Sequence, residues 1–334
     1  MRGVALMSLR YIGPGFMPRT LSYGSHVTAQ QTPRSPADAV PGSWVLRAPS
    51  WARPFLQLSR YDRPAGFWLL ALPCLIALAL SRAGQGFSAD DGGLALLFVA
   101  GAVAMRGAGC TWNDIIDRKI DARVTRTAQR PLPSGAVSLR SAGIWLLAQC
   151  AVGLGVLFCL PEIARWVALG SVPLVALYPL MKRITWWPQV WLGLTFNWGV
   201  LVAAAATRGF ISLPDCLLYA GLVFWTLGYD TIYAVQDLED DALVGVRSSA
   251  RRLGSALRPA VAVIYLGSIV LCSAAGYIVS GLIGILMALP FSLHLMQQAM
   301  RADPARPSRA LSLFRTNRDA GILLLAGWAF IATT

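Results

Sequence analysis

The sequence is poor in charged residues, and its few cysteines and histidines form no catalytic or metal-binding motif. Charged side chains make up 13% of the 334 residues, against 56% hydrophobic ones, and the mean hydropathy is +0.55. None of the six cysteines forms a CxxC pair, and most lie in apolar runs as buried free thiols do. His26 and His294 complete no Ser-His-Asp or Cys-His constellation. This composition is typical of a polytopic membrane protein.

Acidic residues are scarcest at the N-terminus. Residues 1–50 contain five arginines and several Ser and Thr, but one acid, Asp38, and no lysine. An Arg-rich, Ser-rich and acid-poor segment is typical of a mitochondrial presequence, and the alternative is a disordered cytosolic tail. No apolar region follows the first arginines, which argues against a secretory signal. We expect a transit peptide over 1–50 and a transmembrane domain over 51–334.

Nine apolar segments follow an amphipathic lead-in at 51–64, and most approach the ~20 residues that cross a bilayer core. They lie at about 66–81, 93–112, 141–160, 163–180, 187–206, 215–236, 259–279, 281–299 and 320–334. The expected fold is therefore an all-α polytopic membrane bundle of about nine transmembrane helices around a central cavity.

The basic residues divide unequally between the two sides of this bundle. The odd-numbered connections contain three, Arg82, Arg165 and Arg208, whereas the even-numbered ones contain seventeen. This asymmetry follows the positive-inside rule and explains the net charge of +13. Because the charges form no patch or stripe, we expect no nucleic-acid partner. The even-numbered connections would face the matrix if the presequence is mitochondrial.

A row of acidic residues, the first acidic stripe, lies at the C-terminal end of the second apolar segment. If the helix continues through it, Asp114, Asp117 and Asp121 lie on one face with Asn113 beside them. Three carboxylates on one face repel one another unless a cation lies between them. Oxygen ligands at this density suit Mg²⁺, which commonly shares its coordination with substrate phosphates.

A second stripe closes the sixth segment. Asp230, Tyr233, Asp237 and Asp241 have the same helical spacing, whereas Glu239 and Asp240 point away from that face. Two stripes at matching helix ends predict a metal–diphosphate site between them. The alternative is that the acids are solvated loop charges paired with nearby Arg and Lys, although ionisable residues at membrane depth are usually functional.

Basic residues next to the stripes are candidates for binding diphosphate. They are Arg118 and Arg130 after the first stripe, Lys182 and Arg183 at the end of the fourth segment, and Arg247 after the second stripe. Each could equally be a topology determinant. Arg130 is favoured because it begins the segment Arg-Pro-Leu-Pro-Ser-Gly, which predicts a rigid turn.

These residues resemble the UbiA superfamily of membrane prenyltransferases, and within it the branch that prenylates 4-hydroxybenzoate in ubiquinone synthesis. The NDxxDxxxD motif of the family is matched by Asn113, Asp114, Asp117 and Asp121, and its DxxxD motif by Asp237 and Asp241. The strings RPLPSG and YPLMKR also resemble that branch. The resemblance covers about Tyr61 to Asp319.

The resemblance implies transfer of a polyprenyl group from polyprenyl diphosphate to the ring carbon ortho to the hydroxyl of 4-hydroxybenzoate. It implies Mg²⁺ bound through the five motif aspartates, and Asn113 orienting the metal shell. Arg118, Arg130, Tyr178, Lys182, Arg183, Tyr233 and Arg247 would bind substrate. It also implies the mitochondrial inner membrane, with the active site facing the matrix, and association with other ubiquinone-biosynthesis proteins.

The sequence argues against two alternatives and leaves a third open. A cation-coupled transporter would bind its ion near the bilayer midplane at broken helices, whereas these acids cluster at one membrane face. A soluble isoprenyl diphosphate synthase would not contain nine apolar spans. Haem, naphthoate and chlorophyll branches of the superfamily stay open, because the diphosphate half of the site would look the same.

Overall fold

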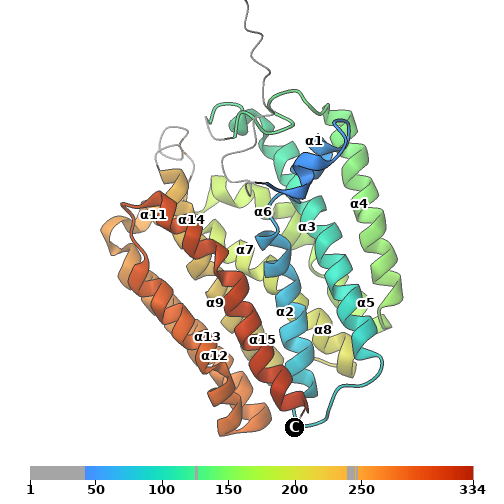
Figure 1. Ribbon diagram of the computed structural model, residues 1–334, viewed down its shortest axis with the longest axis vertical. Helices are drawn as coiled ribbons and strands as arrows, with labels where there is room; N and C mark the ends of the chain where they lie inside the picture. The colour runs from blue at the N-terminus through green and yellow to red at the C-terminus, as the bar shows by residue number, and fades with distance from the viewer. Residues whose placement is uncertain (1–41, 125–126, 239–244, 246, 334) are drawn as a thin grey trace, which may run out of the picture. The chain divides into compact units, whose positions relative to one another are not determined.

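Helices form all the regular secondary structure in the part of the chain that the computed structural model describes, residues 42–124, 127–238, 245 and 247–333 (Figure 1). The all-α expectation is therefore confirmed. In chain order the elements are η1 (Trp44–Arg47), α1 (Arg53–Leu58), α2 (Ala65–Arg82), α3 (Asp91–Asp121), α4 (Leu139–Cys159), α5 (Glu162–Leu169), α6 (Val172–Ile184), α7 (Pro188–Asn197), α8 (Gly199–Arg208), α9 (Leu213–Tyr233), η2 (Ala234–Asp237), α11 (Ser249–Leu253), η3 (Gly254–Ala256), α12 (Leu257–Ser280), α13 (Leu282–Arg301), α14 (Pro307–Arg315) and α15 (Asn317–Thr333).

Seven helical stretches among the described residues are long and apolar enough to cross a membrane. They comprise α2, α3, α4, the pair α5 and α6, the pair α7 and α8, the stretch from α11 to α12, and α13. The two other predicted segments correspond to α9 and α15, which are not among the seven. The membrane bundle is thus confirmed, whereas the count of nine is not.

The long helices pack as neighbours so that the first and last lie together. Helix α2 contacts both α3 and α15, α15 contacts α13, α13 contacts α12, and α12 contacts α9 (Figure 1). Trp225 on α9 joins this group, because its ring contacts Phe291 of α13 edge-on and its Nε1 donates to Asn317 Oδ1 at 2.9 Å. The indole N–H is thereby satisfied inside an apolar core.

Two predicted spans each consist of two short helices that together form one helical stretch of membrane-crossing length. The segment at 163–180 divides between α5 and α6 at Gly170, and the segment at 187–206 divides between α7 and α8 at Trp198. The two breaks meet: Trp198 Nε1 donates to Val167 O at 2.8 Å, and a Cβ on Gly170 would lie 3.2 Å from the Trp198 ring. Sequence hydropathy did not reveal these breaks because both halves of each span are apolar.

Short helices gather at the end of the bundle where the two acidic stripes lie. Helices α1, α11 and α14 lie toward that end in Figure 1, and α14 lies in the connection between the eighth and ninth predicted segments. The predicted presequence at 1–50 lies outside the described residues except for 42–50. All six cysteines are free, although Cys159 and Cys216 are exposed rather than buried.

Candidate active site

The first stripe lies on the last turns of α3, which continues without a break to Asp121 as the spacing predicted. The 31 residues of α3 span about 46 Å, which exceeds a hydrocarbon core of roughly 30 Å. Its final turns can therefore extend past the core. Asp114 and Asp117 are nonetheless fully buried, and Asp121 is 5% exposed. Buried carboxylates require partners.

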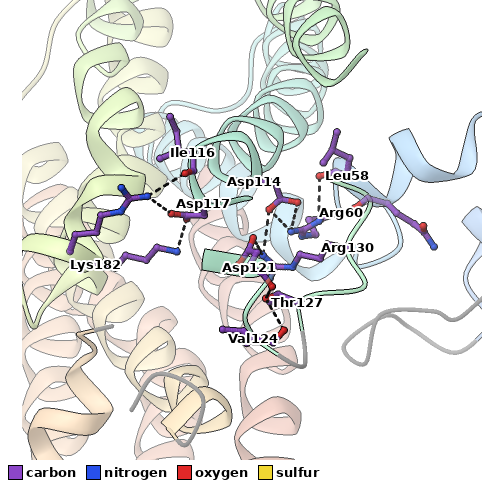
Figure 2. Close-up of polar contacts among 12 residues, drawn as sticks. Leu58, Arg60, Asp114, Ile116, Asp117, Asp121, Val124, Thr127, Arg130 and Lys182 are labelled. Atoms are coloured by element: carbon purple, nitrogen blue, oxygen red, sulfur yellow. Dashed lines mark hydrogen bonds and ion pairs between the residues drawn. The ribbon is translucent and has the colours of Figure 1, made fainter. Parts of the chain in front are cut away.

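Two arginines from different segments bind Asp114 and Asp121 (Figure 2). Arg60 Nη2 donates to Asp114 Oδ1 at 2.7 Å and to Oδ2 at 2.9 Å. Arg130 Nη1 lies 2.9 Å from Asp121 Oδ2 and 3.4 Å from Asp114 Oδ1. Arg130 thus bridges two carboxylates that lie two helical turns apart.

The turn that presents Arg130 is ordered by its own hydrogen bonds, as its sequence predicted. Ser134 Oγ donates to Arg130 O at 2.7 Å, and Gly135 has a φ of +78°, which glycine adopts without strain. Thr127 Oγ1 donates to the carbonyl of Asp121 at 2.8 Å, which ties this loop to the end of α3 (Figure 2).

Asp117 is bound from the opposite side by the end of α6. Lys182 Nζ lies 2.5 Å from Asp117 Oδ2, and Arg183 Nη2 lies 3.0 Å from Asp117 Oδ1. Trp112 Nε1 also donates to Ala176 O at 3.1 Å, so α3 and α6 are joined along their length. The YPLMKR segment therefore reaches the first motif, as the sequence suggested.

Taken together, four cations surround the three carboxylates of the first stripe. These carboxylates are paired with Arg and Lys, as the alternative interpretation of the acidic residues expected. Because they are buried, however, they are not solvated loop charges. No group of three or more His, Cys, Asp or Glu among the described residues is arranged to hold a metal ion. The part of the chain that the structure describes presents the acids bound to side-chain cations.

The second stripe departs from regular helix, which corrects the predicted spacing. Helix α9 ends at Tyr233, and η2 continues as a 3₁₀ turn through Asp237, which is half-buried. Each residue of a 3₁₀ helix turns about 20° further than in an α-helix, so Asp237 leaves the face that Asp230 occupies. The structure does not describe Asp241, Glu239 and Asp240.

Helix α14 packs against this turn. The Phe314 ring lies 4.6 Å from the Tyr233 ring and 5.7 Å from the Tyr229 ring, measured between centroids. Tyr233 therefore has an aromatic packing partner, which its acidic neighbours in the sequence did not suggest. Because η2 also contacts α14 directly, this surface helix supports the second motif.

Three other predicted residues lie close to the site without an ion pair to its aspartates in the described contacts. Asn113 precedes Asp114 on α3 and is half-buried. Arg118 Nη1 donates to Ile115 O at 2.8 Å. Arg247 Nη1 donates to Ile184 O at 2.6 Å, and its guanidinium stacks over Trp186, so it fixes the end of α6 beside Lys182.

Sequence reasoning missed Arg106, which lies two turns before Asp114 within α3. Its guanidinium lies over the Phe196 ring at 5.2 Å, and its buried Nε has no hydrogen-bond partner among the described residues. Its charge acts on Asp230 and on the half-buried Tyr178. A lone arginine inside an apolar segment is the signal that should have identified it.

Arg60 was also missed, and the sequence contained no local signal for it. It lies in a mixed apolar and basic lead-in, 54 residues before the aspartate that it binds. Only the packing of α1 against α3 brings the two side chains together.

Comparison with known proteins places this chain in a family. A family model described as the UbiA prenyltransferase family matches residues 70–331. A Homo sapiens relative named mitochondrial 4-hydroxybenzoate polyprenyltransferase is 41% identical over 293 residues, which are 85% of this chain and 76% of the relative. The Saccharomyces cerevisiae protein of the same name is 38% identical and covers 84% of this chain and 77% of its own length.

Solved structures of UbiA homologues also superpose on this chain. A UbiA homologue from Aeropyrum pernix K1, in its apo form, superposes with a TM-score of 0.65 at 29% identity, covering 78% of this chain and 96% of its own. A homologue from Archaeoglobus fulgidus, bound to GPP and Mg²⁺, gives a TM-score of 0.61 at 16% identity, over 84% of this chain and 99% of its own, and supports the fold alone. The chain therefore belongs to the UbiA prenyltransferase family.

Proposed function

We propose that this chain transfers the polyprenyl group of a long-chain polyprenyl diphosphate to the ring carbon ortho to the hydroxyl of 4-hydroxybenzoate. The products are 3-polyprenyl-4-hydroxybenzoate and diphosphate, in ubiquinone biosynthesis. The observation that carries the proposal is the meeting of buried aspartates with cations from α6 and the Arg130 turn. The human and yeast relatives named for this activity support the choice of acceptor.

The donor set suits a divalent metal. Asp114 and Asp117 are close enough to Asp121 for their charges to act on it, and all three offer only oxygen ligands. In the proposal Asp114, Asp117, Asp121, Asp237 and Asp241 hold Mg²⁺, with Asn113 orienting the shell. Bound Mg²⁺ supplies positive charge that stabilises the diphosphate as it leaves.

The cations now paired with aspartates are placed to bind the diphosphate oxygens. Arg130, Lys182 and Arg183 come from separate segments and converge on α3. Each can exchange a carboxylate oxygen for a phosphate oxygen without leaving the site, since both are charged acceptors of the same kind. Arg118 and Arg247 act from the rim, where they bind backbone carbonyls.

Arg106 is the proposed anchor for the acceptor. The Nε of the half-buried Arg106 is buried and has no hydrogen-bond partner among the described residues, so it can bind a carboxylate, and 4-hydroxybenzoate carries one. The neighbouring ring of Phe196 suits a flat aromatic acceptor. In this arrangement Tyr178 and Tyr233 line the space between the two motifs, and the benzoate lies deeper in the bundle than the diphosphate.

The proposed location is the mitochondrial inner membrane, with the site facing the matrix and the polyprenyl tail in the bilayer. Residues 1–50 act as the presequence and 51–334 as the transmembrane prenyltransferase domain. Mitochondrial relatives and the apolar helices support this. The excess of basic residues on the motif side supports the matrix orientation. Other ubiquinone-biosynthesis proteins are the proposed partners.

The test uses membranes that contain the full chain, labelled 4-hydroxybenzoate, long-chain polyprenyl diphosphate and Mg²⁺. We expect a labelled, lipid-extractable product that disappears on adding EDTA and returns with excess Mg²⁺. Membranes containing the Asp114→Ala variant provide the control and should give no product. Product formed only with another aromatic acceptor would contradict the 4-hydroxybenzoate assignment, and indifference to EDTA would contradict the metal assignment.

A further inference from the structure

Arg60 has a backbone conformation that arginine rarely adopts. It is the one described non-glycine residue with a positive φ, 62°. It follows the C-cap of α1, where Arg60 N donates to Gln57 O and Tyr61 N donates to Leu56 O, both at 3.0 Å. This is the Schellman arrangement, in which glycine usually fills the position that Arg60 occupies. An unfavourable backbone with a large side chain indicates that the side chain has a function.

The Arg60 side chain is held on both sides. Nη1 donates to Gln57 O at 3.1 Å, and Nη2 donates to both carboxylate oxygens of Asp114 (Figure 2). The Arg60 side chain is 9% exposed, and that of Asp114 is fully buried. The guanidinium is therefore fixed in place by α1 and lies against both oxygens of the first aspartate in the motif.

We propose that Arg60 is a built-in counter-ion for Asp114 that opposes binding of a divalent metal until a diphosphate is present. The inference rests on the proposed function in that it takes Asp114 as a metal ligand. A metal ion would need an Asp114 oxygen that Arg60 now occupies, and would approach a fixed positive charge. Metal binding to the substrate-free chain is therefore weak.

A diphosphate changes this balance. Its oxygens accept hydrogen bonds from a guanidinium as carboxylates do, and its charge offsets that of the metal. Arg60 can then turn from Asp114 toward the diphosphate while its backbone stays fixed by the end of α1. Metal and diphosphate consequently bind cooperatively, and the metal does not remain bound after the diphosphate has left.

The experiment measures Mn²⁺ binding to the detergent-solubilised full chain by the EPR signal of free Mn²⁺, with and without inorganic diphosphate. Formation of the Mn²⁺–diphosphate complex is measured without protein and subtracted. In the wild type we expect diphosphate to strengthen Mn²⁺ binding about tenfold, within the usual range of coupling between sites. Arg60→Gly should bind Mn²⁺ alone about tenfold more tightly than the wild type, and lose most of the coupling.

Arg60→Gly is a suitable variant because glycine favours this backbone conformation, and Arg60→Gln removes the same charge with a side chain kept. Arg123→Gln is the matched control, since Arg123 is exposed just beyond α3 and its loss changes the net charge equally. Mn²⁺ binding unchanged in both Arg60 variants, or increased equally in the control, would overturn the inference. Wild-type protein that binds Mn²⁺ as tightly without diphosphate as with it would also overturn the inference.

Asp114→Asn separates this inference from the proposed function. If it binds Mn²⁺ with diphosphate as the wild type does, Asp114 is not a ligand and both ideas fail. If it loses that binding while the Arg60 variants behave as the wild type, the metal site stands and the role of Arg60 is refuted.

Discussion

The two acidic motifs are held in different ways. The first lies on an unbroken helix, and its three buried carboxylates are fixed by ion pairs from Arg60 just beyond α1, from the Arg130 turn and from α6. The second begins at Asp237, the last residue of the 3₁₀ turn that follows α9. Tyr233, which precedes this turn, packs against Phe314 of α14. The first motif is positioned by ion pairs, whereas the described ring contacts of the segment that leads into the second are aromatic.

This difference suggests that the two motifs have different roles in substrate binding. Side chains fixed by several ion pairs are preorganised and change partners only when another charged group replaces those pairs. A 3₁₀ turn supported by the short helices α11 and α14 can adjust its position at low cost, because its hydrogen bonds are weaker than those of an α-helix. We expect the first motif to recognise the diphosphate, and Asp237 on the 3₁₀ turn to adjust its position when the metal and diphosphate bind.

The largest effect should come from removing one carboxylate from either motif. Asp114→Asn and Asp237→Asn should each lower turnover at least about a hundredfold, comparable to the loss of a charge-stabilising group in other active sites. The measurement is single-turnover product formation at saturating Mg²⁺ with protein that remains membrane-inserted. Near-normal turnover in Asp237→Asn would show that the second motif does not share the site.

The stability of the same two variants should differ. Asp114→Asn leaves Arg60 buried against a neutral side chain, and should lower the free energy of unfolding by roughly 3 kcal/mol. Adding Arg60→Gln to the Asp114→Asn variant should restore at least about 1 kcal/mol of the lost free energy of unfolding. Asp237 is half-buried, whereas Asp114 is fully buried, so Asp237→Asn should cost less. Unfolding in detergent, followed by circular dichroism, measures five proteins: the wild type, the three single variants Asp114→Asn, Arg60→Gln and Asp237→Asn, and the double variant.

An additive Arg60→Gln/Asp114→Asn pair would contradict the view that the two side chains interact in the free protein. Equal destabilisation by Asp114→Asn and Asp237→Asn would remove the proposed contrast between the motifs.

Truncating Phe314 should affect the second motif alone. The half-buried ring supports Tyr233, so Phe314→Ala should cost about 2 kcal/mol of stability. It should also raise the Mg²⁺ concentration for half-maximal turnover about tenfold, the low end of what changes beyond the metal ligands cost. Phe314→Leu should retain most activity. Phe330→Ala, on the exposed face of α15, is the control, and an equal Mg²⁺ shift there would refute the role of α14.

The sequence predicted the parts of the site that depend on local periodicity. The helical run through Asp121 and the turn after Arg130 follow from spacing and from proline and glycine, so both were correct. The end of α9 at Tyr233 was not predicted, because the spacing of the acidic residues does not distinguish an α-helix from the 3₁₀ turn that follows and contacts α11 and α14. The ion pair between Arg60 and Asp114 was also beyond prediction, since nothing in either segment specifies the other.

The smallest expected difference is between the two cations that share Asp117. Lys182 is the closer to the carboxylate and its side chain is 26% exposed, whereas that of Arg183 is 43% exposed and also binds the carbonyl of Ile116. Exposed charges contribute less to binding because solvent screens them. Lys182→Gln should therefore raise KM for the prenyl diphosphate about tenfold, and Arg183→Gln about threefold. If steady-state kinetics instead gave the larger KM increase for Arg183→Gln, the Arg183 side chain would have to turn inward when substrate binds.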